Sequence, residues 1–304
     1  MGIPRPVARL LMEEGRRRPF GGRVLQLGRS YVYLTWPELE RWARRDGFPL
    51  RADVPVTLSH EPSLARLGCL SDETFFRALG FDEVESCDLF AAERPTWKLD
   101  LNRPIPDELE GRFDVVLDPG SLVHLFDQRQ AFRNLSRLTK TDGRVIHGTD
   151  PSSNNVDIGF YMVSPTLYAD LYPANGWRLE SLLLCLYEPL WIGGIFAPPV
   201  WDAYRYEPGS IDHLRFGGLG GRAAAVWAVA TKLAGAGMEV LPVQGNYRRM
   251  YGEPAAPEAP APEPGETPPA TAGRPSKVAL LAKRWTRRLR RFIPPRLPPR
   301  HGRY

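Results

Sequence analysis

The stretch Phe113-Asp-Val-Val-Leu-Asp-Pro-Gly-Ser-Leu-Val-His124 decides the fold that this sequence predicts. Its first five residues, 113–117, form a short apolar run that favours a buried strand. Asp118-Pro-Gly120 then ends the strand with turn residues. A helical pattern from about Asp127 to Thr139 leads to a second apolar run at 144–147. This strand–helix–strand order predicts two parallel strands joined by a helix.

The same alternation extends in both directions along the chain. Further strands are predicted at 23–27, 84–89, 96–101, 177–187 and 223–232. Helices are predicted at 36–45 and 71–79, because Thr35 and Ser71 stand where N-caps are favoured. Strands alternating with helices indicate an α/β domain with a mainly parallel sheet and helices on both faces.

Composition divides the chain into a folded part and a basic end. Residues 253–273 hold seven prolines and four glutamates without a large apolar residue, so they predict a disordered linker. Residues 274–304 hold eleven Lys or Arg and no acid. The remaining residues, 1–252, carry 29 basic and 31 acidic side chains, so the domain itself gives no charge argument for binding nucleic acid. We expect an extension at 1–20 and a domain at 21–252.

Cysteines and apolar runs limit the cellular setting. Cys69, Cys87 and Cys185 are far apart in the sequence, which predicts buried thiols and neither a disulfide framework nor a metal site. No run of about 18 apolar residues is present, and the start of the chain lacks the apolar segment of a secretory signal. We expect a cytoplasmic protein.

Polar residues follow the predicted strands where each one ends. They are Gly28-Arg29-Ser30, Asp88, Asp100-Leu101-Asn102, Asp118-Pro-Gly120-Ser121 and His147-Gly-Thr-Asp150. Ligands of open α/β sheets bind outside the carboxyl ends of the strands. These residues are therefore the candidate binding site.

This order of strand ends resembles the class I S-adenosylmethionine-dependent methyltransferases. The resemblance covers about residues 22–245, and the segments 113–124, 132–146 and 159–176 carry it most clearly, the last being similar to a bacterial subgroup. It implies a Rossmann-like, doubly wound, mainly parallel seven-stranded sheet with an antiparallel closing strand. The runs 177–187 and 223–232 would be the antiparallel strands that close this sheet.

The resemblance also implies a role for each strand end. Gly28 and Arg29 would lie under the methionine moiety of S-adenosylmethionine, and Asp88 would hold the ribose hydroxyls. Asp100, Leu101 and Asn102 would surround the adenine, and Asp118 and Gly120 would be further contacts to the cofactor. The family's first loop has glycines spaced as GxGxG, whereas here Gly28 alone remains of that pattern.

Each of these residues also has a purely structural interpretation. Asp88 could cap a solvated loop, and Asp100 and Asn102 could form a turn through their own backbone. Asp118 could likewise serve the turn at Pro119-Gly120. Gly217-Gly-Leu-Gly-Gly221 lacks the ending of a phosphate loop and favours a hairpin turn.

Two further sets of residues are candidates for contact with the molecule that accepts the methyl group. His124 could take a proton from a hydroxyl or amine acceptor, because an imidazole titrates near neutral pH. Tyr161, Tyr168, Tyr172 and Trp177 could line an acceptor pocket, or they could pack in the core.

The basic end contains an amphipathic pattern, SKVALLAKRWTRRLRRFI at 276–293. Val278, Leu281, Trp285, Leu289 and Phe292 recur at steps of three and four and therefore share one helical face. This favours a basic helix on an anionic membrane surface, which would place the protein at the inner membrane face. An acidic partner, nucleic acid phosphates or a solvated tail are the alternatives.

Three hypotheses for function follow. The first is methyl transfer from S-adenosylmethionine to a small-molecule or glycan-type acceptor. The second is a catalytically degenerate scaffold or binding module with the same fold, which the reduced glycine loop favours. The third, an enzyme that binds NAD or a nucleotide sugar, lacks the GxGxxG loop expected for dinucleotides.

Overall fold

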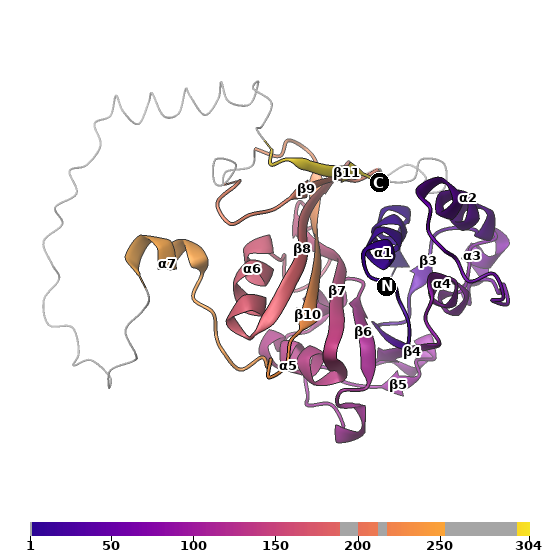
Figure 1. Ribbon diagram of the computed structural model, residues 1–304, viewed down its shortest axis with the longest axis horizontal. Coiled ribbons are helices and arrows are strands. Elements are labelled where there is room, and N and C mark those ends of the chain that lie inside the picture. The colour runs from indigo at the N-terminus through magenta and orange to yellow at the C-terminus, as the bar shows by residue number, and fades with distance from the viewer. Residues whose placement is uncertain (1, 189–199, 212–217, 253–296) are drawn as a thin grey trace, which may run out of the picture.

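A twisted sheet runs through the centre of the molecule (Figure 1). The computed structural model describes residues 2–188, 200–211, 218–252 and 297–304. In these ranges nine strands form one sheet, in the order β11-β9-β8-β10-β7-β6-β2-β4-β5, and β1 pairs with β3 beside it. The strands are β1 (Gly2–Ile3), β2 (Arg23–Leu27), β3 (Tyr31–Val32), β4 (Glu83–Asp88), β5 (Trp97–Lys98), β6 (Phe113–Asp118), β7 (Thr139–Ser153), β8 (Trp177–Tyr187), β9 (Asp202–Arg205), β10 (Ala223–Lys232) and β11 (Arg300–Arg303).

Helices pack on both faces of this sheet, as the sequence predicts. The α-helices are α1 (Arg5–Arg17), α2 (Trp36–Asp46), α3 (Pro62–Arg66), α4 (Asp72–Leu79), α5 (Gln128–Leu138), α6 (Pro165–Ala174) and α7 (Gly245–Tyr251). Three short 3₁₀ helices are η1 (Ala91–Glu93), η2 (Asp107–Leu109) and η3 (Leu122–His124). One core joins α1, α2 and α4 to the sheet, and a second core joins α5 and α6 to its opposite face.

Strand directions confirm the mainly parallel core and correct one detail. Strands β5, β4, β2, β6 and β7 are parallel neighbours, and β10 is antiparallel to both β7 and β8. Since β8 is antiparallel to β10, it runs in the same direction as β7. The expectation that 177–187 would also run antiparallel to the parallel strands is therefore wrong, and β10 alone reverses direction among the seven strands from β5 to β8.

Several boundaries agree with the sequence because local signals set them. The bounds of β2, β8 and β10 are those predicted. At α2 the Glu38 carboxylate accepts a hydrogen bond from the Thr35 backbone N–H at 2.9 Å, and at α4 the Ser71 hydroxyl accepts one from the Thr74 N–H at 3.0 Å. Strand β5 is shorter than predicted and ends at Lys98, since the chain turns away at Asp100.

Helix α1 belongs to the α/β core, although the sequence analysis separates residues 1–20 as an extension. Val7, Leu10 and Leu11 of this helix are buried against the sheet. The buried Glu14 carboxylate meets Arg144 of β7, with 2.6 Å between Glu14 Oε1 and Arg144 Nη1. Both side chains are 4% exposed. The amphipathic pattern of α1 and this ion pair make the helix part of the folded α/β domain.

The far end of the chain also returns to the sheet. Strand β11, within the predicted basic tail 274–304, pairs antiparallel with β9. Tyr304 and Trp201 exchange two backbone hydrogen bonds, of 2.9 and 3.0 Å. The predicted linker 253–273 and amphipathic segment 276–293 lie outside the described residues, as does Gly217. Among the residues that the structure describes, no helix is long and apolar enough to cross a membrane.

We expect Glu14→Ala to destabilise the protein by about 3–5 kcal/mol, because it leaves the Arg144 guanidinium buried without its counter-ion. Urea unfolding followed by circular dichroism measures this. The matched control is Glu73→Ala, which removes an exposed ion pair with Arg77 on α4 and should cost about 0.5 kcal/mol or less. Equal losses in the two variants would contradict a structural role for the buried pair.

Candidate functional site

The strand order creates a point where successive connections leave in opposite directions. From β2 the chain proceeds to its neighbour β4 and then to β5 beyond it, and it then crosses back to β6 and β7 on the other side of β2. In an open α/β sheet the crevice at such a switch point, at the carboxyl ends of the strands, is the ligand-binding position. Here the switch point lies between the ends of β2 and β6, which carry Gly28 and Asp118, with Asp88 at the end of β4.

The first loop, residues 28–30, is held in place by side-chain contacts to β2 and α4. Gly28 adopts a φ of 77°, as the turn out of β2 requires. Arg29, predicted to meet the ligand's methionine end, instead pairs with Asp72 at the start of α4, with 3.2 Å between Nε and Oδ2. Gln26 of β2 donates to the same carboxylate and accepts from the backbone N–H of Ser30. The loop is thus tied to α4, although 43 residues separate Arg29 from Asp72.

Ser30 and Asp88 present polar atoms at this edge. Among the described residues, the buried Ser30 Oγ has no hydrogen-bond partner. Asp88 is partly exposed, and its Oδ1 accepts a hydrogen bond from the Phe90 backbone N–H at 2.8 Å. Asp88 therefore forms the turn that the structural interpretation predicts, while its other oxygen, Oδ2, has no partner within the described ranges.

Asp100, Leu101 and Asn102 form a tight turn. The Asp100 Oδ1 atom accepts from both the backbone and the side-chain nitrogen of Asn102, at 3.0 Å each. These bonds, the side-chain one first, lower the pKa of Asp100. The Asn102 Oδ1 atom accepts from the N–H groups of Phe126 and Asp127, and Leu101 is buried. The structure thus places this turn beside the loop after β6.

Asn134 anchors that turn, although its sequence position does not mark it as a site residue. Its side chain, on α5, donates to the carbonyls of Leu101 and Arg103 at 2.9 and 2.8 Å and accepts from the Ile105 N–H at 3.3 Å. It is 1% exposed. The sequence offers one signal for this role, an asparagine on the apolar face of a predicted helix. Its partners could not be predicted, because they lie about 30 residues away in the chain.

We expect Asn134→Ala to leave two carbonyls and one amide unpaired, to cost about 1–3 kcal/mol and to loosen the 100–105 turn. Hydrogen exchange should show faster exchange of the Ile105 amide in the variant. Arg129→Ala, an exposed change on the same helix, is the control. Unchanged Ile105 exchange in Asn134→Ala would contradict the anchoring role.

Asp118 and Gly120 form the turn after β6. Asp118 is fully buried, and its Oδ1 accepts from the backbone N–H groups of Gly120, Ser121 and Leu122 at 3.1, 2.6 and 3.2 Å. Gly120 has a φ of 92°, which favours glycine. The Ser121 hydroxyl donates to the Leu27 carbonyl and so joins the ends of β6 and β2. Asp118 therefore fixes the backbone conformation of the turn after β6.

The second oxygen of Asp118 enters a buried polar cluster, formed by Asp118, His147, Asp150, Tyr168 and Tyr172. Its Oδ2 lies 3.0 Å from His147 Nδ1, and Asp150 Oδ2 lies 3.4 Å from the same nitrogen. Tyr172 Oη lies 2.7 Å from His147 Nε2, and the Tyr168 hydroxyl donates to Asp150. All five side chains are buried. Tyr168 stacks on the His147 ring, with 4.4 Å between the centroids.

A β-bulge in β7 makes this cluster possible. On β10, Val226 and Ala228 are two residues apart, but their partners on β7, Asp150 and His147, are three apart. In a regular strand, residues 147 and 150 would point to opposite faces. The extra residue turns both side chains toward the face covered by α5 and α6. Bulges re-aim side chains in this way.

Burial and close contacts shift the ionisation of the cluster. Burial raises the pKa of Asp150 to about 6, and the charge of Asp118 adds to this, while His147 and Tyr168 partly offset it. Burial would lower the pKa of His147, but Tyr172 and hydrogen bonds to Asp118 and Asp150 outweigh it and hold that pKa well above its usual range. Asp118, His147 and Asp150 offer ligand atoms that all lie within 4.8 Å of one another, although the sequence analysis expected no metal ligands.

The predicted aromatic residues have different environments. Tyr168, Tyr172 and Trp177 are buried, which confirms the core-packing interpretation for these three. Tyr161 is exposed, and its hydroxyl donates to the Phe126 carbonyl at 2.9 Å. Phe126 meets Phe160 edge to face at 5.9 Å, and both are largely exposed. The loops after β6 and β7 therefore present apolar rings to solvent.

Histidines near this edge differ in exposure. His124 on η3 is exposed. His60, which the sequence analysis did not select, stacks on Tyr31 at 5.0 Å between ring centroids and lies 3.7 Å from the Glu93 carboxylate. Tyr31 donates to Glu93 at 3.0 Å. Tyr31 follows the first loop directly, and Glu93 lies in η1 after β4.

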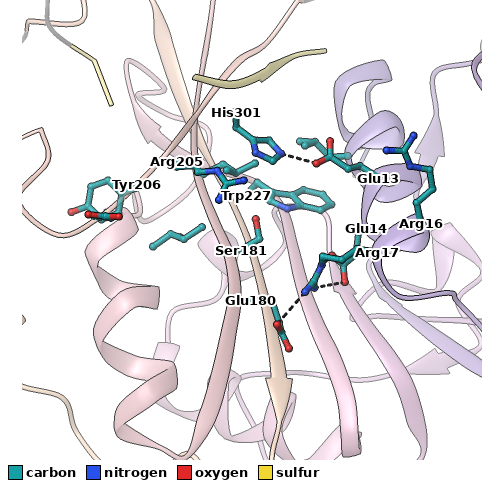
Figure 2. Close-up of a pocket in the computed structure, with 14 residues that line it drawn as sticks. Glu13, Glu14, Arg16, Arg17, Glu180, Ser181, Arg205, Tyr206, Trp227 and His301 are labelled. Carbon is teal, nitrogen blue, oxygen red and sulfur yellow. Dashed lines mark hydrogen bonds and ion pairs between the residues drawn. The ribbon is translucent and has the colours of Figure 1, made fainter. Parts of the chain in front are cut away.

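A groove of about 630 Å³ lies elsewhere, between α1 and the strands β8 to β10 (Figure 2). Trp227 and Leu183 contribute apolar surface to it. Glu13 at its rim accepts from His301 of β11 at 2.7 Å, and Glu180 pairs with Arg17 at 3.1 Å. Its lining comes from α1, from the middle of β8 and β10, and from residues at and after the end of β9, and it includes none of Gly28, Asp88 and Asp118. This groove is therefore separate from the switch point.

Comparisons with known proteins give structural likeness without sequence matches. No family model matches the chain, and no curated protein matches it. A protein from Galdieria sulphuraria assigned as a sarcosine dimethylglycine methyltransferase is 14% identical, covering 75% of this chain and 86% of its own, with a TM-score of 0.40. One from Bacillus halodurans assigned as a methyltransferase is 12% identical over 74% and 98%, with a TM-score of 0.37.

A third solved structure contains ligands. It is the 1,6-didemethyltoxoflavin-N1-methyltransferase of Burkholderia thailandensis, with 1,6-didemethyltoxoflavin and S-adenosylhomocysteine bound, 14% identical over 75% of this chain and 77% of that one, at a TM-score of 0.31. These solved structures are of methyltransferases. Since their TM-scores lie below 0.5, the assignment of a Rossmann-like fold rests on the strand order and switch point of the sheet itself.

Proposed function

We propose that this chain binds S-adenosylmethionine at the carboxyl ends of β2, β4 and β6 and transfers its methyl group to a small-molecule or glycan-type acceptor. The observation that carries the proposal is the switch point between β2 and β6, with the partly exposed Asp88 beside it. The methyltransferase resemblance of the strand ends supports the choice of ligand.

The residues at this edge fit such a ligand at two points. Asp88 Oδ2, without a partner among the described residues, suits the paired hydroxyls of a ribose. The buried Ser30 Oγ, also without a partner in those ranges, is a polar group that a ligand would satisfy. A bound sulfonium donor supplies an electrophilic methyl group. This chain's part is then to orient an acceptor and exclude water.

The acceptor side is assigned to the loops after β6 and β7. His124 is the proposed proton acceptor, since it is exposed on η3 in the loop after β6. Phe126, Phe160 and Tyr161 offer apolar surface beside it, because the Phe160 N–H donates to Val123 and Tyr161 donates to Phe126. An acceptor with an apolar ring suits such a surface.

A second candidate is a catalytically degenerate binding module. The observation that favours it is the first loop, which keeps one glycine of the family's GxGxG pattern and in which Arg29 pairs with Asp72 of α4. Such a module binds the ligand weakly or not at all, so direct binding separates the two candidates.

We expect calorimetric titration to detect binding of S-adenosylmethionine and its demethylated product. Asp88→Asn should weaken binding about 10- to 100-fold, because it removes a charged acceptor of hydrogen bonds. Glu83→Gln, an exposed change at the opposite end of β4, should leave the affinity unchanged. No heat of binding at about 1 mM ligand would reject the enzyme proposal. Equal affinities of wild type and Asp88→Asn would remove Asp88 from the ribose role.

We also propose that the segment 276–293 holds the protein on an anionic membrane surface. The support is the sequence pattern, in which apolar residues share one helical face among basic residues. Trp285 and Phe292 would enter the head-group region.

Co-sedimentation with vesicles containing anionic phosphatidylserine tests this in the full chain, because a truncation at residue 252 would also remove β11 from the sheet. The double variant Trp285→Ala/Phe292→Ala should lose most of the bound fraction, while Tyr247→Ala, an exposed aromatic residue on α7, should not. Equal binding of the double variant and wild type would refute the membrane role.

A further inference from the structure

We propose that Asp118, His147 and Asp150 bind one divalent transition-metal ion of the zinc or manganese type inside the domain. This site lies on the α5 and α6 face of β6 and β7, and it does not depend on the proposed methyl transfer. One imidazole with two carboxylates suits these ions, since imidazole favours zinc and carboxylates favour manganese.

The spacing of the three ligand atoms fits an ion among them. Zinc binds nitrogen and oxygen at about 2.0–2.2 Å, so two ligands at a tetrahedral angle stand roughly 3.4 Å apart. His147 Nδ1 is 3.0 Å from Asp118 Oδ2 and 3.4 Å from Asp150 Oδ2. All three atoms lie within 4.8 Å of one another. Small side-chain movements therefore suffice to bind a cation.

A second observation points to a ligand. The Asp150 Oδ1 atom is buried and accepts no hydrogen bond from the described residues. Buried carboxylate oxygens otherwise have partners. When the Asp150 carboxylate chelates an ion through both oxygens, Oδ1 becomes the fourth donor atom and is satisfied.

Charge balance supports the same conclusion. His147 Nδ1 can carry a single proton, yet two carboxylate oxygens lie near it in a site that is fully buried. A divalent cation with two carboxylates and a neutral imidazole has no net charge, as a buried site requires.

The surrounding contacts would hold the ligands in the required orientation. His147 Nε2 lies 2.7 Å from Tyr172 Oη. In a metal-bound site the proton of the neutral imidazole would be on Nε2 and would be donated to Tyr172 Oη, which leaves Nδ1 free for the ion. Three backbone amides hold Asp118 Oδ1, and Tyr168 donates to Asp150. Partners of this kind fix the tautomer and the orientation of metal ligands.

Metal analysis of the full chain, purified without a histidine tag, tests the proposal. Because the site is buried, the ion should enter during folding and remain through dialysis of the native protein against EDTA. Mass spectrometry of the elements should find about one zinc or manganese ion per chain. Unfolding in guanidinium chloride with EDTA should release the ion. Refolding without metal should then give a thermal midpoint several degrees lower than refolding with it.

Variants locate the ion. His147→Gln and Asp150→Asn should abolish metal retention, while Asp114→Asn on β6 and His301→Gln on β11 should keep it, since both lie outside the cluster. If the cluster variants fail to fold, wild-type protein refolded with Co²⁺ decides, because a protein-bound tetrahedral cobalt ion gives visible ligand-field bands. Wild-type protein that holds no metal, refolds equally well without it and shows no cobalt bands would overturn the proposal.

Discussion

The carboxylate of Asp118 links the turn at the carboxyl end of β6 to a polar cluster buried inside the domain. One oxygen accepts hydrogen bonds from three consecutive backbone amides and so shapes the turn after β6. The other faces His147 on the neighbouring strand. The same turn carries Ser121, whose hydroxyl donates to the Leu27 carbonyl, so Asp118 helps to hold the ends of β6 and β2 together at the switch point. A change of charge at Asp118 would therefore affect both the turn after β6 and the buried cluster around His147.

Much of the fold could be predicted because its signals are local. Apolar runs defined β2, β8 and β10, and capping residues located the starts of α2 and α4. The structure extends the predicted seven strands with β9 and β11. Their pairing depends on contacts between β9 and residues almost 100 positions later, which periodicity does not reveal. The packing of α1 into the core likewise depends on a partner in β7.

The site was predictable in outline and not in its contacts. The sequence identified the strand ends, and the structure places Gly28, Asp88 and Asp118 at one edge of the sheet. The sequence could not show that Arg29 pairs with Asp72, since the two residues are far apart in the chain. It also could not show that His147 and Asp150 share a face. Strand periodicity predicts the opposite, and only the pairing with β10 shows the bulge.

Strands β5 and β11 form the two edges of the described sheet. An edge strand exposes unpaired backbone groups on which another chain can add a strand. Strand β5 has two residues, one of them the exposed Lys98, and β11 has four, including the exposed Arg300 and Arg303. Short edges with positive charge disfavour such addition. A broad sheet of apolar central strands is thereby protected against edge-to-edge aggregation between copies.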